Sequence, residues 1–307
     1  MKNFYKNSGF SFKKQSKNVI LFMVVYMKLN FIINKYLLMW YLLCRESNIN
    51  EVNDFKQNFL SLHRKEAFML IKEKDIIMSY LKDYIPDDDF IFNKFYNTDE
   101  FKKLQKDTNK YRISMLEAYD KNKKVILKNL NKLLKYDLNI SYDICFVHKK
   151  LDVIEFNLKT NLIVLGKDIK PSEALGFYIL IVYKILENEY KKFKPEEKEI
   201  VTSILELVIY NELFTRVSGK NRYNIGNQKL RKTKEKIYPY FLMYMGILEA
   251  DFDKRMEEDN IYFDSVKYNN NLKLMDLYSF ITFIIKNKTR VLDTKILKVK
   301  KEQEEML

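Results

Sequence analysis

Residues 151–219 read LDVIEFNLKTNLIVLG, KDIKPS, EALGFYILIVYKILENEY and KKFKPEEKEIVTSILELVIYNELFTRVSG in succession, and this stretch decides the fold. Apolar and polar residues alternate over 153–158, which predicts a strand with one buried face. A continuous apolar run at 162–165 predicts a strand covered on both faces. Lys159 to Asn161 form a turn between the two, so the stretch opens with a β-hairpin.

Two helices follow this hairpin. The middle of the first, at 172–190, carries only one charge, Lys184, and a helix that is apolar almost all round is buried. The second, at 195–218, begins with Pro195 and two glutamates and ends just before Gly219. These start and stop signals agree with each other and with the helix dipole.

Apolar residues at helical spacing predict further helices on both sides of the stretch. They lie at 50–85, 98–136, 239–258 and 271–286, and a strand is predicted at 141–148.

The predicted fold class is therefore α+β and mainly α. A small antiparallel sheet over about 141–166 is covered by long helices, with the buried central helix at about 172–190. Three segments follow from composition. We predict a leader or membrane anchor at 1–44, a single helical α+β domain at 45–287 and a charged tail at 288–307.

Net charge is concentrated at the N-terminus. The chain has a formal charge of +14, and residues 1–43 contain seven lysines and no acid. The remaining chain is only mildly basic, and its lysines far outnumber its arginines. Because nucleic-acid binders favour arginine forks, composition argues against nucleic acid as a partner. Two cysteines, Cys44 and Cys145, do not make a disulfide framework.

The N-terminal segment has the order of an export signal. Residues 1–18 are basic and polar, and residues 19–44 are mostly apolar. If translation starts at Met27 rather than Met1, the segment MKLNFIINKYLLMWYLLC resembles a bacterial lipoprotein leader, which implies acylation of Cys44. That family has small residues just before the cysteine, where this chain has Leu42 and Leu43. The alternatives are a permanent signal anchor or an apolar helix packed on the domain.

Motifs for catalysis and cofactors are absent from the sequence. It contains no P-loop, no G-x-G-x-x-G and no G-x-S-x-G, so we predict no cofactor and no catalytic residue. His63 and Glu66 share a helix face without the second pair that a di-metal site needs. Cys145 and His148 fall on opposite faces of the predicted strand. The acidic triplet 87–89 lacks calcium-loop spacing. We therefore predict no metal.

One resemblance concerns chain order. The strand at 162–165 followed by helix 174–190 is similar to the strand and active-site helix of zincin metalloproteases. Glu206 and Glu212 lie where that family has a downstream glutamate ligand. The chain lacks H-E-x-x-H, so the resemblance implies a scaffold without zinc or hydrolysis.

A basic segment, KNRYNIGNQKLRKTKEK at 220–236, holds seven basic residues and one acid. It is either a solvated loop or a binding site for phosphates and anionic surfaces. The candidate anion-binding residues are Lys220, Arg222, Lys229, Arg231, Lys232 and Lys234.

Together these observations predict an exported, membrane-tethered protein of the bacterial envelope. Its partners are the membrane, through the N-terminal segment, and an envelope protein, and most of the chain lies outside the cytoplasm. The role is interaction or structure rather than catalysis. The alternatives are an inactive zincin-like protein and a cytoplasmic protein that binds anions or nucleic acid through 220–236.

Overall fold

A computed structural model provides the structure. It describes residues 27–62, 64, 96–136, 138–220, 226–258, 262–263, 266–294 and 296–297. Several sequence predictions fall outside these residues: the segment 1–26, His63, Glu66, the acidic triplet 87–89 and Arg222.

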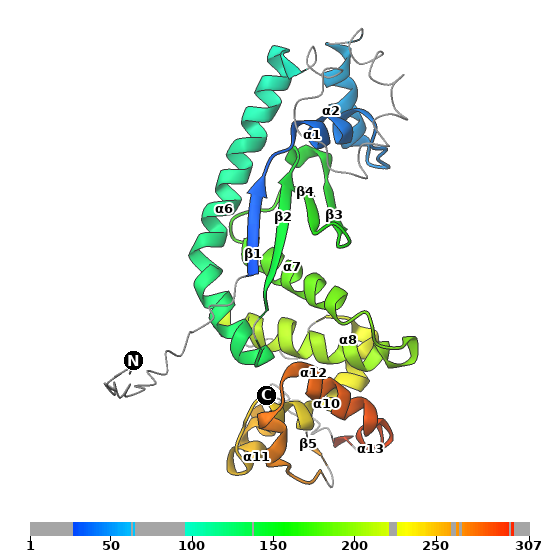
Figure 1. Cartoon of the computed structure of the whole chain (residues 1–307). Helices are drawn as coiled ribbons and strands as arrows, with labels where there is room; N and C mark the ends of the chain where they lie inside the picture. Colours follow the sequence, from blue (N-terminus) through cyan, green and yellow to red (C-terminus); the bar gives the residue numbers. More distant parts are fainter. Residues whose placement is uncertain are drawn as a thin grey trace, which may run out of the picture.

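A four-stranded mixed sheet lies at the centre of the molecule (Figure 1). Its strands, in the order β1-β2-β4-β3, are β1 (Met27–Ile32), β2 (Ile140–Phe146), β4 (Leu162–Gly166) and β3 (Val153–Asn157). β1 and β4 both run parallel to β2, and only β3 and β4 are antiparallel. The hairpin is confirmed, but the prediction of an antiparallel sheet is wrong, because β4 inserts between β2 and β3.

The two faces of the sheet support two separate cores. Side chains that alternate along β2 point to opposite faces, as the strand period requires. Tyr142, Ile144 and Phe146 belong to the larger core, which contains α6 (Asp99–Leu134) and α7 (Ala174–Glu189). Cys145 belongs to a smaller core on the other face.

Helix α1 (Lys35–Leu43) fills the smaller core. Seven of its residues, 36–42, are buried, and Leu38, Met39 and Leu42 are fully enclosed. Asn34 caps the helix by accepting a hydrogen bond from the Leu37 N–H at 3.0 Å. Because this helix packs against protein on all sides, burial in the domain accounts for its apolar character.

The long helices before and after the sheet are placed as predicted. α2 (Asn50–Ser61) covers the first part of the predicted helix 50–85, whose remainder lies outside the described residues. α6 confirms the helix at 98–136, and α7 confirms the buried helix at 172–190. The mainly helical α+β class is thus confirmed.

The helix predicted at 195–218 is present as four consecutive segments. They are η3 (Pro195–Glu197), α8 (Lys198–Glu206), η4 (Leu207–Leu213) with π-helical hydrogen bonding, and α9 (Phe214–Ser218). Gly219 ends them with a left-handed φ of 69°. The Tyr183 ring of α7 stacks on the Tyr210 ring of η4 at 4.6 Å, so these two predicted helices pack together.

The C-terminal third differs most from the prediction. Pro239, predicted to start or kink a helix that runs to about residue 258, does not start one. It lies inside α10 (Arg231–Tyr244), which follows η5 (Gln228–Leu230) and includes part of the predicted loop 220–236. The break comes at Gly246, where φ is 78°, before α11 (Glu249–Glu258). A left-handed glycine after a helix is a common terminator, so Gly246 was the relevant signal.

The last described elements also belong to the packed domain. They are β5 (Tyr262–Phe263), η6 (Asn270–Leu274), α12 (Leu277–Lys286), α13 (Lys288–Leu292) and β6 (Ile296–Leu297), which pairs with β5. Val291 is fully buried, and the Lys236 ammonium donates to the Leu292 carbonyl. Packing therefore continues beyond residue 287, into the segment predicted as a charged tail.

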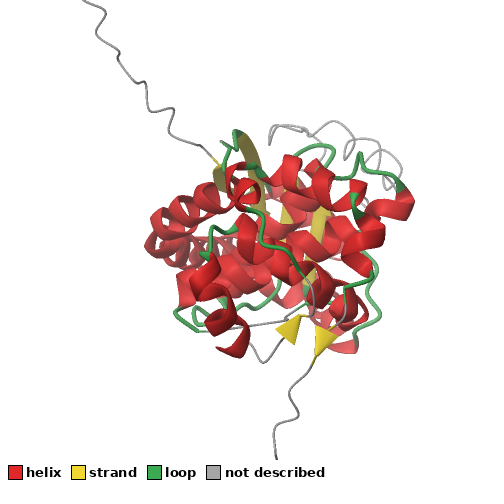
Figure 2. Cartoon of the chain, turned by 90° about the horizontal axis from the view of Figure 1, so that it is seen from below, coloured by secondary structure: helices red, strands yellow, loops and turns green. Residues whose placement is uncertain are grey.

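Figure 2 shows from below how helices cover the strands. Within the described ranges, none of these helices is both long enough and apolar enough to cross a lipid bilayer.

Candidate functional site

The largest described cavity lies at the carboxyl edge of the parallel strands. β1, β2 and β4 all end there, because parallel strands share the direction in which they run. In Figure 1 the arrowheads of β1 and β2 point toward the end of the molecule that holds α1 and α2. The cavity has a volume of about 820 Å³ and lies among α2, the first half of α6 and the loops after β2 and β4. Ligands in open α/β sheets bind at such edges.

Its lining combines apolar and basic side chains. The apolar part comes from Phe55 and Phe59 of α2 and from Leu62 just after it, with Leu104 and Tyr111 of α6 and Ile169. The Tyr111 hydroxyl donates to the Lys167 carbonyl, which ties α6 to the loop after β4.

Gly166, the last residue of β4, lies very close to neighbouring chain beside the cavity. A Cβ at this position would lie 2.4 Å from Cγ2 of Val147, so only glycine lets β4 approach the chain after β2 so closely.

His148 is the buried polar residue of the cavity. Its ring stacks on Phe55 with centroids 4.9 Å apart, and its Nδ1 accepts the Lys150 N–H at 3.4 Å. Burial lowers the pKa of His148 to about 4. The nearby Asp107 carboxylate acts to raise this pKa, and the positive charges of Lys150 and Lys149 act to lower it. The imidazole is therefore neutral at pH 7. With Nδ1 accepting, its proton sits on Nε2.

This pKa predicts a pH-dependent loss of stability. His148 becomes protonated near pH 6.5 in the unfolded chain and near pH 4 in the folded chain. Its contribution to the free energy of unfolding is therefore complete above pH 6.5 and declines as the pH falls toward 4. Urea unfolding at pH 7 and 4.5 should show wild type losing about 2 kcal/mol more than His148→Asn, at roughly 1.4 kcal/mol per pH unit. Equal losses in both proteins would contradict the assignment.

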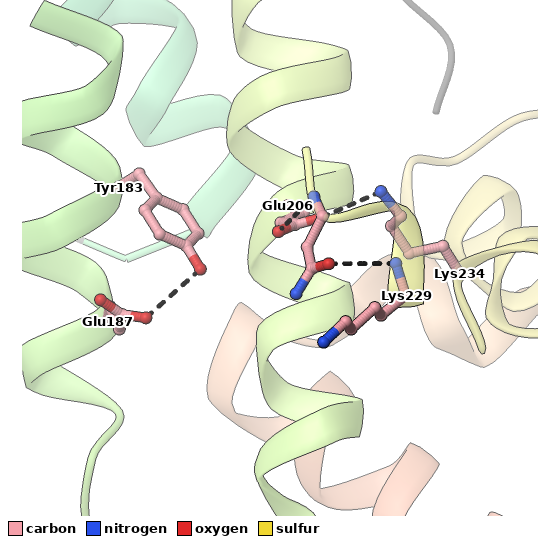
Figure 3. A network of polar contacts seen from close by, with 6 residues as sticks. Tyr183, Glu187, Glu206, Lys229 and Lys234 are labelled. Carbon is pink, nitrogen blue, oxygen red and sulfur yellow. Dashed lines mark hydrogen bonds and ion pairs between the residues drawn. The ribbon is translucent and has the colours of Figure 1, made fainter. Parts of the chain in front are cut away.

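Glu206 and Lys234 form a buried ion pair. Figure 3 shows Lys234 reaching Glu206 of α8 from α10, with Nζ 2.9 Å from Oε2 and the two side chains 1% and 4% exposed. The Asn227 N–H donates to both Glu206 oxygens at 3.1 Å. A Cβ on Gly226 would lie 2.4 Å from Glu206 Oε2, so glycine makes room for the carboxylate.

This ion pair affects which cationic side chains of the basic segment 220–236 are available to an external anion. Lys234 already has its counter-ion inside the protein, so it is not available to an external anion. Lys220, Lys229 and Lys232 are exposed, and Arg231 pairs with Glu235 at 3.0 Å. Anion binding by these exposed residues stays a prediction.

The two glutamates of the zincin comparison have separate partners. Glu212 pairs with Arg216 at 2.8 Å along its own helix, while Glu206 is bound to Lys234. Figure 3 also shows Tyr183 and Glu187 of α7 facing α8. The two helices pack together, as a zincin-like scaffold requires, but the similarity stays a prediction. The described part of the chain holds no group of three His, Cys, Asp or Glu residues able to share a metal ion.

Cys44 ends helix α1 and is half-buried. Its backbone N–H donates to the Trp40 carbonyl at 2.7 Å. Acylation of Cys44 stays a prediction, with a physical condition attached: cleavage before this residue would remove β1 and α1 from the domain.

Comparisons with known proteins returned no match. No family model, curated protein or solved structure matches this chain.

Sequence reasoning missed the cavity. The predicted strand 141–148 includes His148, but β2 ends at Phe146, and His148 follows it at the carboxyl end. Its position just after a strand was a usable signal, because residues at such ends converge when the strands are parallel. Parallel pairing of β2 and β4 was not predicted, so the convergence was not either.

Proposed function

We propose that this protein is a binding protein that holds a small organic molecule in the cavity between α2 and α6. The observation that carries the proposal is a cavity of about 820 Å³ at the carboxyl edge of three parallel strands. Pockets for small ligands are commonly about 300–1,000 Å³ and combine apolar walls with a few polar groups. His148 and the surrounding lysines are those polar groups here.

A neutral aromatic probe tests this proposal. N-phenylnaphthylamine, which fluoresces when it enters an apolar site, should bind the wild-type protein. Ser114 lies on the exposed rim of the cavity, so Ser114→Trp should obstruct part of it and weaken binding at least about tenfold, or ~1.4 kcal/mol.

The neighbouring residue supplies a matched control. Ile113 is 40% exposed and is not part of the cavity lining, so Ile113→Trp should bind the probe like wild type. Probe binding that is absent, or equal in both variants, would overturn the proposal.

We also propose that residues 1–26 tether this binding domain to a membrane at the bacterial envelope. They contain five lysines and no acid, and residues 19–26 read VILFMVVY. Basic residues beside an apolar run favour an anionic membrane surface. Fractionation of cells expressing the full chain and a variant lacking 1–26 tests this. Equal distribution of the two proteins between membrane and soluble fractions would exclude the tether.

A further inference from the structure

The lysines around the cavity exceed its acids. The lining contains five lysines and three carboxylates. Two of those carboxylates have partners within the lining: Asp107 pairs with Lys110 at 3.3 Å, and Asp168 with Lys149 at 3.1 Å. A ligand entering the cavity therefore meets a net positive field.

Three lysines supply that field from three elements. Lys103 lies on α6, Lys150 on η2 (Lys149–Leu151) and Lys170 on the loop after β4. Among the described residues, none of the three forms an ion pair. Lys150 lies over the Phe55 ring, with Nζ 5.5 Å from its centroid.

His148 adds a directional donor to this field. It is 8% exposed and lines the same cavity, and its Nδ1 is occupied by the Lys150 N–H. The remaining nitrogen, Nε2, carries the proton and makes no hydrogen bond to the residues that the structure describes. A donor of this kind on the cavity lining favours a ligand that brings an acceptor.

From this geometry we infer that the ligand is an organic anion, with an aromatic or aliphatic body and one carboxylate, phosphate or sulfonate group. The body lies against Phe55, Phe59 and Leu104. The anionic group lies among Lys103, Lys150 and Lys170 and accepts a hydrogen bond from His148. This inference rests on the proposed function, because it assigns the chemistry of the molecule that the cavity holds.

Two probes that differ by one charged group test it. Anilinonaphthalene sulfonate has the ring system of N-phenylnaphthylamine plus a sulfonate. On wild type at low salt, the anionic probe should bind about tenfold more tightly than the neutral one, and added salt should reduce this advantage. A triple variant, Lys103→Gln, Lys150→Gln and Lys170→Gln, should lose the advantage while keeping the affinity for the neutral probe.

A second triple variant removes the same charge elsewhere. Lys121, Lys124 and Lys128 are exposed on the far half of α6, and their replacement by Gln should leave the preference intact. If the neutral probe binds but the anionic probe binds no more tightly, or if both triple variants lose the preference equally, the inference is overturned and the proposed function stands. If neither probe binds, the proposed function fails as well.

Discussion

Deleting residues 1–44 is expected to abolish folding, whereas deleting residues 1–26 should leave the domain folded. The first deletion removes β1, whose six residues pair with β2, and α1, whose buried residues fill the smaller core. Each fully buried Leu, Met or Phe contributes about 1.5–3 kcal/mol. The loss exceeds the ~5–15 kcal/mol that stabilises a typical domain. The described residues of both cores run from Met27 onward.

Far-UV circular dichroism and urea unfolding of both truncated proteins provide the measurement. Adjacent point variants provide the control. Leu42 is fully buried and Leu43 is half-buried, so Leu42→Asp should destabilise far more than Leu43→Asp. A cooperatively folded protein that begins at Arg45 would contradict this prediction. It would also make a leader that ends at Cys44 compatible with a folded mature domain.

Replacing Lys234 by Met is expected to lower the free energy of unfolding by about 3–5 kcal/mol. The change leaves the Glu206 carboxylate buried without its counter-ion, and an uncompensated buried charge has a cost of this size. Urea unfolding at pH 7 measures the effect. Lys232→Met removes an exposed lysine of the same helix, and we expect a change of at most about 0.5 kcal/mol from it.

The double variant Glu206→Gln with Lys234→Met separates charge from packing. It removes both charges, so it should be more stable than Lys234→Met alone. Its side chains keep nearly the same volume, and a glutamine oxygen can still accept the Asn227 N–H. Three variants within 1 kcal/mol of wild type would show that the pair contributes little.

The segment 27–44 shows how one pattern allowed two interpretations. Its apolar content favoured a leader or anchor, but Met27, Leu29 and Phe31 alternate with polar residues, which is the period of a strand. The polar residues that interrupt it have structural roles: Asn34 caps α1, and Asn30 donates to Asp143 of β2 at 2.8 Å. An apolar helix looks the same in a protein core and in a membrane, so composition alone did not separate the two.

Local signals determined most elements. Alternation marked the β3–β4 hairpin, the nearly uncharged run marked α7 as buried, and proline, glutamates and glycine set the limits of 195–218. These features act within a few residues of chain, so the sequence by itself contains them. The sequence also determined the mainly helical class and the excess of lysine.

Only the tertiary structure decided which strands are neighbours and which side chains meet. β1 and β2 are separated by more than a hundred residues, and no local pattern specifies their parallel pairing. The parallel pairing of β2 with β4 brings His148 and Lys170, which follow these strands, to one edge, where α2 and α6 line a cavity. In the same way, Glu206 and Lys234 are 28 residues apart and appear as two surface charges until α8 and α10 pack together. Contacts between residues so far apart in the sequence depend on how buried surfaces fit together. The order of residues alone does not show this fit.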